Sequence, residues 1–150
     1  MSSAATANQQ ALKIFKQVKL RGKKKLDWVI YKIDVKEKEI QPEKTSSDEK
    51  VKGIEGLVKN LPSMQPRYAI YDHEFKTNDG RSTSKLYFFS FTPTNSNQLD
   101  RVIYAQSMKP FRDSLSGIFP VSFNTPNEIL LQFKPEAAEE EEEDEDEDFA

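Results

Sequence analysis

The sequence predicts an α/β fold in which helices cover a sheet. Segments with apolar residues at helical spacing alternate along the chain with segments rich in β-branched and aromatic residues. That alternation is typical of helices packed on a sheet. The chain has 150 residues, which is the length of one domain with a single hydrophobic core.

Three segments have helical periodicity. In residues 8–20 the apolar positions Ala11, Ile14, Phe15 and Val18 form one stripe, and Asn8 is a suitable N-cap. We expect the second helix in residues 51–61, before a proline. The third should occupy residues 97–116, before a glycine.

Five segments are predicted strands: residues 27–34, 39–43, 67–75, 85–92 and 119–123. Residues 76–81 separate the third from the fourth and contain Asn-Asp-Gly, a strong turn signal. We therefore expect an antiparallel hairpin with an exposed tip.

The charge of the chain is unevenly distributed. The net charge is −3, but residues 136–150 contain eleven acidic residues and no basic one. The first 135 residues carry 22 basic and 14 acidic side chains, or +8. Such a basic domain predicts an anionic partner. We expect residues 135–150 to be a disordered acidic tail, and the alternative is that this tail folds over the basic domain.

Composition also argues against several classes of protein. The chain has no cysteine, no signal-peptide pattern and no apolar run long enough for a membrane span. We therefore expect a soluble cytosolic protein with a flexible N-terminus over residues 1–7. His73 is the only histidine, and it lies in a predicted strand, where a structural role is expected. With no phosphate-binding loop, nucleophile motif or metal-ligand spacing, we expect neither an enzyme nor a bound cofactor.

Five segments together resemble the actin-depolymerising factor/cofilin family. They are ALKIFKQVKL (11–20), WVIYKI (28–33), RYAIYDHEF (67–75), KLYFFSFTP (85–93) and RVIYAQSMKPFRDSLSG (101–117), in the order and near the spacing of the family. The resemblance implies a mixed sheet of five to six strands with helices on both faces, in a domain over residues 8–134. It also implies binding to monomeric and filamentous actin, promotion of filament disassembly and severing, and a monomeric, cytoplasmic protein.

The third predicted helix is the expected monomer-binding surface. At 100° per residue, Met108 and Arg112 fall within about 20° of Arg101. By resemblance, Arg101 and Arg112 match basic contact positions, and Lys109 replaces a family lysine at position 108. Pro110 is a departure that could split the helix. The full expected monomer-binding set is Ser3, Arg101, Tyr104, Met108, Lys109 and Arg112.

The resemblance places filament binding on the hairpin and on a C-terminal helix. Arg81 and Lys85 supply the basic charge near the hairpin, whereas Pro135 limits the C-terminal helix to about two turns. The resemblance is therefore weaker for the filament-binding surface than for the monomer-binding surface. Ser2 and Ser3 lie where the family has a regulatory phosphorylated serine, and phosphate there would oppose binding to an acidic partner.

A basic surface could also bind phosphoinositide headgroups. The candidates are Lys23, Lys24, Lys25, Arg101, Lys109 and Arg112. By resemblance, the cluster at residues 23–25 could instead support nuclear entry.

Two alternative functions remain open. One is the related glia maturation factor, which acts on filament branches and has a similarly short hairpin. The other is a basic module that binds nucleic acid or histones, because three lysines lie near Trp28. The sequence pI of about 5.3 argues against nucleic acid, so none is expected as a partner.

Overall fold

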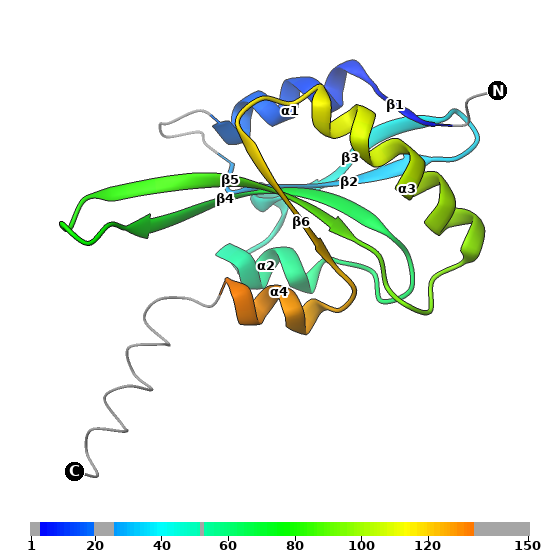
Figure 1. The fold of residues 1–150 in the computed structure, drawn as a ribbon. Helices are drawn as coiled ribbons and strands as arrows, with labels where there is room; N and C mark the ends of the chain where they lie inside the picture. Colours follow the sequence, from blue (N-terminus) through cyan, green and yellow to red (C-terminus); the bar gives the residue numbers. More distant parts are fainter. Residues whose placement is uncertain (1–3, 20–25, 52, 134–150) are drawn as a thin grey trace, which may run out of the picture.

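The computed structural model describes residues 4–19, 26–51 and 53–133. Single strands or pairs of strands lie between its helices, and Figure 1 shows their arrangement. They are β1 (Thr6–Ala7), α1 (Gln9–Lys19), β2 (Trp28–Asp34), β3 (Glu39–Thr45), the 3-10 turn η1 (Ser46–Asp48), α2 (Gly53–Lys59), β4 (Arg67–Lys76), β5 (Ser82–Phe91), α3 (Gln98–Asp113), β6 (Ile118–Phe123) and α4 (Pro126–Gln132).

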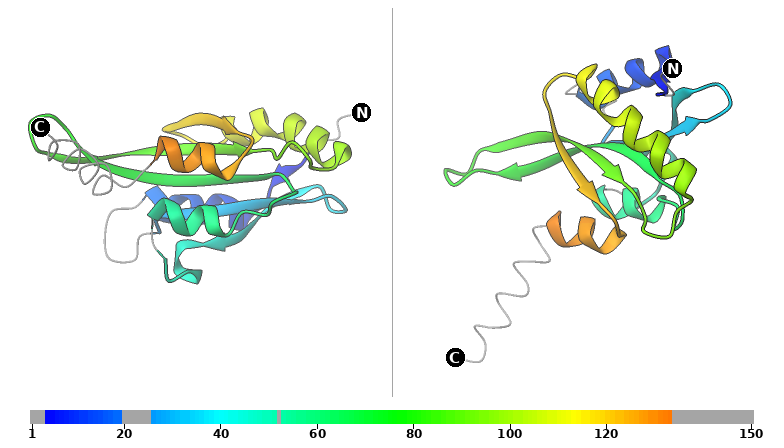
Figure 2. Two further views of the ribbon diagram at one scale, coloured as in Figure 1. Left: turned by 90° about the horizontal axis from the view of Figure 1, so that it is seen from below. Right: turned by 45° about the vertical axis from the view of Figure 1, so that its right-hand side comes forward.

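The six strands form one mixed sheet in the order β1-β3-β2-β4-β5-β6. The four central strands pair antiparallel with one another, whereas the edge strands β1 and β6 pair parallel with β3 and β5. The hairpin of β4 and β5 extends well beyond the rest of the sheet (Figures 1 and 2). Its turn contains Gly80 at φ 86°, a conformation that glycine adopts without strain. The predicted mixed sheet and its hairpin are confirmed.

Helices cover both faces of the sheet, so the domain has two apolar layers. Side chains alternate along each strand, and therefore Val29 and Tyr31 face α1 and α3 while Trp28 and Ile30 face the opposite side. Figure 1 shows α1 and α3 above the sheet and α2 and α4 below it. Both layers contain many aromatic side chains. For example, the Phe111 ring contacts the rings of Tyr31, Tyr68 and Phe88.

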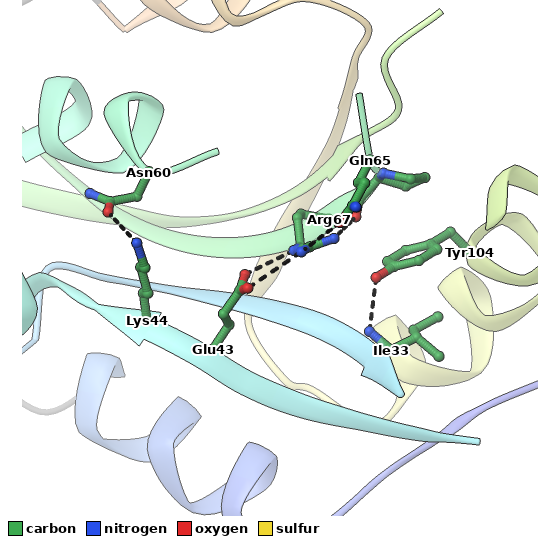
Figure 3. Close-up of polar contacts among 8 residues, drawn as sticks. Ile33, Glu43, Lys44, Asn60, Gln65, Arg67 and Tyr104 are labelled. Carbon is green, nitrogen blue, oxygen red and sulfur yellow. Dashed lines mark hydrogen bonds and ion pairs between the residues drawn. The ribbon is translucent and has the colours of Figure 1, made fainter. Parts of the chain in front are cut away.

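A β-bulge in β3 allows a partly buried ion pair beside the sheet (Figure 3). Ile30 pairs with Lys44 and Tyr31 with Pro42, so Glu43 is the extra residue. Its carboxylate accepts hydrogen bonds from Arg67 at 2.8 and 3.3 Å. Two other guanidinium N–H groups donate to the Pro66 carbonyl and the Gln65 side-chain oxygen. This fork fixes the start of β4 against β3, although β2 lies between those strands.

The N-terminal boundary of the domain differs from the prediction. Residues 1–7 were expected to be flexible, but Thr6 and Ala7 form β1, and Ala5 is buried. The backbone N–H of Ala5 donates to Ser107 Oγ at 2.8 Å, which ties the segment to α3. Backbone pairing of this kind leaves no periodic side-chain pattern, so the sequence did not indicate it. Residues 1–3 and the acidic tail lie outside the described residues.

Candidate protein-binding surface

Helix α3 lies on the sheet with one buried side and one exposed side. Asn97 caps its start, because the side-chain oxygen accepts from the N–H groups of Leu99 and Asp100 at 2.7 and 3.3 Å. Ile103, Ser107 and Phe111 are buried against the sheet. Arg101 and Val102 lie on the exposed side. The helix therefore presents a mixed cationic and apolar face to solvent.

A groove runs between this exposed face and the neighbouring strands. It has a volume of about 480 Å³. At 100° per residue, the α3 residues that line it lie within about 60° of Ala105. The strands contribute small polar side chains, which leave the groove open. The lining residues are Gln98, Arg101, Val102, Ala105 and Met108 from α3, together with Ser90, Thr92 and Ser122.

Tyr104 is not on this surface, which corrects the prediction for that residue. Its side chain is only 5% exposed. The hydroxyl accepts a hydrogen bond of 2.8 Å from the Ile33 N–H, as Figure 3 shows. Its backbone carbonyl accepts from the Tyr68 hydroxyl. Burial raises the pKa of Tyr104, so the phenol stays neutral. Tyr104 supports α3 from beneath.

The C-terminal half of α3 continues through Pro110 without a break. The helix runs to Asp113, and the Ser114 N–H bonds the carbonyls of Pro110 and Phe111 at 3.2 and 3.0 Å. The helical phase that aligns Arg101, Met108 and Arg112 is therefore preserved. Lys109 lies beside this stripe and pairs with Asp113 at 2.9 Å, a hydrogen bond that lowers the pKa of the Asp113 carboxyl.

The hairpin presents the two residues predicted for filament binding, at separate places. Arg81 is exposed in the turn, and its Nε lies 3.0 Å from Asp79 Oδ2. The Thr77 hydroxyl also donates to Asp79, and together these bonds lower the pKa of Asp79. Lys85 lies on β5, four residues after Arg81, and its Nζ is 4.9 Å from the centre of the Phe119 ring on β6.

Helix α4 is as short as the sequence predicted. Thr125 and Glu128 form a capping box: Glu128 N–H donates to Thr125 Oγ1 at 3.3 Å, and Thr125 N–H donates to Glu128 Oε1 at 3.1 Å. The helix ends at Gln132, after two turns. A second hollow of about 420 Å³ lies beside it, and it shares Ser122 with the groove. The open surface thus continues from α3 across β6 to α4.

Several predicted residues cannot be placed. Ser2, Ser3, Lys23, Lys24 and Lys25 lie outside the described residues. The ordered residues that follow Ser3 are held against α3 through Ser107. Among the described residues, no group of His, Cys, Asp and Glu could hold a metal ion. Within those same ranges, no helix is long and apolar enough to cross a membrane.

The sequence and the fold match a known family. The family model described as "Cofilin/tropomyosin-type actin-binding protein" matches residues 4–133, and the chain belongs to this family. An actin-depolymerizing factor 11 from Oryza sativa subsp. japonica is 34% identical over 122 residues, covering 81% of this chain and 83% of that protein. These matches confirm the resemblance found in the sequence.

Solved structures agree with that assignment. Cofilin from Streptomyces griseoflavus superposes with a TM-score of 0.71 and 26% identity, over 85% of this chain and 90% of that one. Glia maturation factor from Caenorhabditis elegans superposes with a TM-score of 0.68 over 90% of this chain and all of that one. Its identity is 22%, so this second likeness shows the fold alone.

The sequence prediction missed part of the groove. Ser90, Thr92 and Ser122 are small polar residues on two strands, and nothing in their local sequence distinguishes them from other strand residues. Val102 could have been found, because an exposed apolar residue beside a cationic stripe on a helix indicates a contact surface. It is 44% exposed and lines the groove.

Proposed function

We propose that the protein binds monomeric actin with the exposed face of α3 and the adjoining groove, and that it binds filaments and promotes their disassembly. The observation that carries this proposal is the groove itself, which combines apolar side chains with the guanidinium of Arg101 at one wall. An apolar groove with a cationic rim suits an acidic protein surface. The chain belongs to an actin-binding family, and its relatives are named for actin depolymerisation.

The protein acts, in this proposal, by binding alone and at the cytoplasmic actin cytoskeleton. Two surfaces contribute. The first is α3, with Arg101, Met108 and Arg112, next to the anchored N-terminal segment. The second is the hairpin, with Arg81 and Lys85, which would contact a neighbouring subunit in the filament. Phosphoinositide binding by Arg101, Lys109 and Arg112, and nuclear entry, stay predictions from charge and resemblance.

Matched single substitutions test whether the two surfaces have separate roles. Arg101→Ala should weaken binding to monomeric actin about 5- to 30-fold, because truncating a central interface charge costs roughly 1–2 kcal/mol. Lys85→Ala should weaken filament co-sedimentation and leave monomer affinity unchanged. Lys36→Ala removes an equal charge from an exposed position in the β2–β3 turn and should change neither.

Three measurements decide the outcome: co-sedimentation with filaments, a monomer-binding titration, and filament length after mixing. Loss of monomer binding in Arg101→Ala alone would support the assignment of α3. Equal losses of monomer affinity in Arg101→Ala and Lys36→Ala would mean that only the net charge of the protein matters. That result would reject α3 as the binding site. If the unmodified protein bound neither form of actin but released filament branches, the depolymerising role would be wrong.

A further inference from the structure

The face of the hairpin that is turned toward α4 carries a row of aromatic rings. His73 and Phe75 stack with centroids 5.8 Å apart, His73 lies 6.1 Å from Tyr87, and Tyr87 lies 6.0 Å from Phe119. We call these four residues the aromatic ladder. Phe119 is 47% exposed, and the other three rings are partly exposed. The hydrophobic layers of the domain cover the ladder only in part.

The same face is cationic. Lys85 on β5 lies directly opposite His73 on β4, and its ammonium group lies over the exposed Phe119 ring. The acidic strand residues Asp72 and Glu74 alternate with His73 and Phe75, so their side chains point to the opposite face. Arg81 adds a second cation at the tip, beside Asp79. An occupant of this face should therefore bring negative charge together with an apolar or aromatic group.

The described chain ends at this ladder. Phe133 follows α4 and is only 3% exposed, and its ring lies 5.2 Å from His73 and 4.8 Å from Tyr87. Figures 1 and 2 show that the C-terminal end of α4 points to the side on which the hairpin extends. The segment that follows contains the acidic run 139–148 and then Phe149. Its composition is the one that the ladder requires.

We propose that the acidic run 139–148 binds the cationic face of its own hairpin, with Phe149 contacting the aromatic ladder. Carboxylates of the run pair with Lys85 and Arg81. Residue 139 lies six positions after Phe133, which allows a reach of about 20 Å at up to ~3.3–3.6 Å per residue. The six positions from Tyr87 to Arg81 span about 20 Å of strand. The run can therefore reach the whole length of this face.

A consequence depends on the proposed function. Lys85 and Arg81 also form the proposed filament-binding surface, so a bound tail would compete with the filament. The apparent filament affinity is proportional to the fraction of molecules whose surface is free, so a bound tail lowers it. The α3 groove lies on the other side of the sheet, and the tail would leave monomer binding unchanged. The contact itself can be measured without actin.

The absence of cysteine makes the direct experiment simple. Ala150→Cys creates a single thiol, and a nitroxide attached there broadens the NMR signals of nearby amides in the full-length, isotope-labelled protein. We expect broadening at residues 73–75, 83–87 and 118–119 at about 0.01 M salt, where the Debye length is about 30 Å. At about 1 M salt the Debye length is about 3 Å, and the broadening should be lost.

Matched charge variants separate a specific contact from general attraction. Arg81→Gln with Lys85→Gln should abolish most of the broadening at the hairpin. Lys32→Gln with Lys36→Gln removes the same charge from exposed positions on and after β2 and should leave the broadening intact. Equal loss in both double variants, or broadening centred on α1 and α3, would overturn the proposal.

Two further arms complete the test. In the first arm, spin-labelled protein of natural isotope abundance is mixed with isotope-labelled wild type that carries no spin label. This mixture should show no broadening. Broadening in that mixture would mean that the tail binds a second copy, which contradicts the proposal. Replacing the acidic residues of 139–148 by Asn and Gln should tighten filament binding about 2- to 10-fold at low salt. If hairpin broadening is observed but filament binding is absent, the proposed function fails while the tail contact stands.

Discussion

At the residue scale, Tyr104 shows how a single residue can attach a helix to the sheet beneath it. Its hydroxyl satisfies the Ile33 N–H at the end of β2, and its carbonyl accepts from Tyr68 on β4. Both bonds are buried. These bonds attach α3, the helix that also carries Arg101 and Met108, to the underlying strands.

At the residue scale, Tyr104→Phe should lower stability and leave the surface chemistry unchanged. The substitution removes the acceptor of the Ile33 N–H, and an unsatisfied buried donor costs about 1–3 kcal/mol. Urea denaturation measures this loss of unfolding free energy. Actin affinity of the folded variant should equal that of wild type. A large loss of affinity at full stability would return Tyr104 to the binding surface.

At the scale of an element, α3 contains a proline where helices seldom tolerate one. Pro110 is exposed and lies in the last turns of the helix. It has no N–H for the helical hydrogen bond, and it restricts the unfolded chain. Pro110→Ala should therefore stabilise the protein by about 1–2 kcal/mol, after the gain in helix propensity is offset by unfolded-state entropy.

Leu99→Ala is the matched control for that substitution, since Leu99 is 80% exposed on the same helix. It should change the unfolding free energy by no more than about 0.5 kcal/mol. Both values come from the same denaturation experiment. A destabilised Pro110→Ala variant would show that the proline fits this helix better than alanine does.

Elements with a strong local signal were predictable, and those formed by distant contacts were not. The Asn-Asp-Gly turn predicted the hairpin, and the Ala11, Phe15 and Val18 stripe predicted α1. In contrast, β1 depends on backbone pairing with β3, and the Glu43 ion pair depends on Arg67, which is 24 residues away. The groove needed the relative placement of α3, β5 and β6, which periodicity alone does not provide.

At the scale of the whole molecule, one sheet joins two hydrophobic layers. Phe88 and Phe89 are neighbours on β5 and fully buried, but they belong to opposite layers. The single tryptophan, Trp28, lies in the layer with Phe89. Its fluorescence therefore reports directly on one side of the sheet only.

Phe88→Ala should destabilise the protein by about 3–5 kcal/mol, as is typical of large aromatic truncations in a core. Because small domains unfold cooperatively, the loss should appear in full in the Trp28 fluorescence transition on the opposite layer. Val35→Ala is the control, since Val35 is 53% exposed. An unchanged Trp28 transition in Phe88→Ala would mean that the two layers unfold independently.

The bond between Ala5 and Ser107 also constrains the order of events during protein synthesis. The two residues are 102 positions apart, so the first strand cannot complete its contacts until α3 has left the ribosome. At translation rates of about 5–20 residues per second, the delay is about 5–20 s. During that interval, enzymes that act on nascent chains have access to a segment that the finished domain holds against α3.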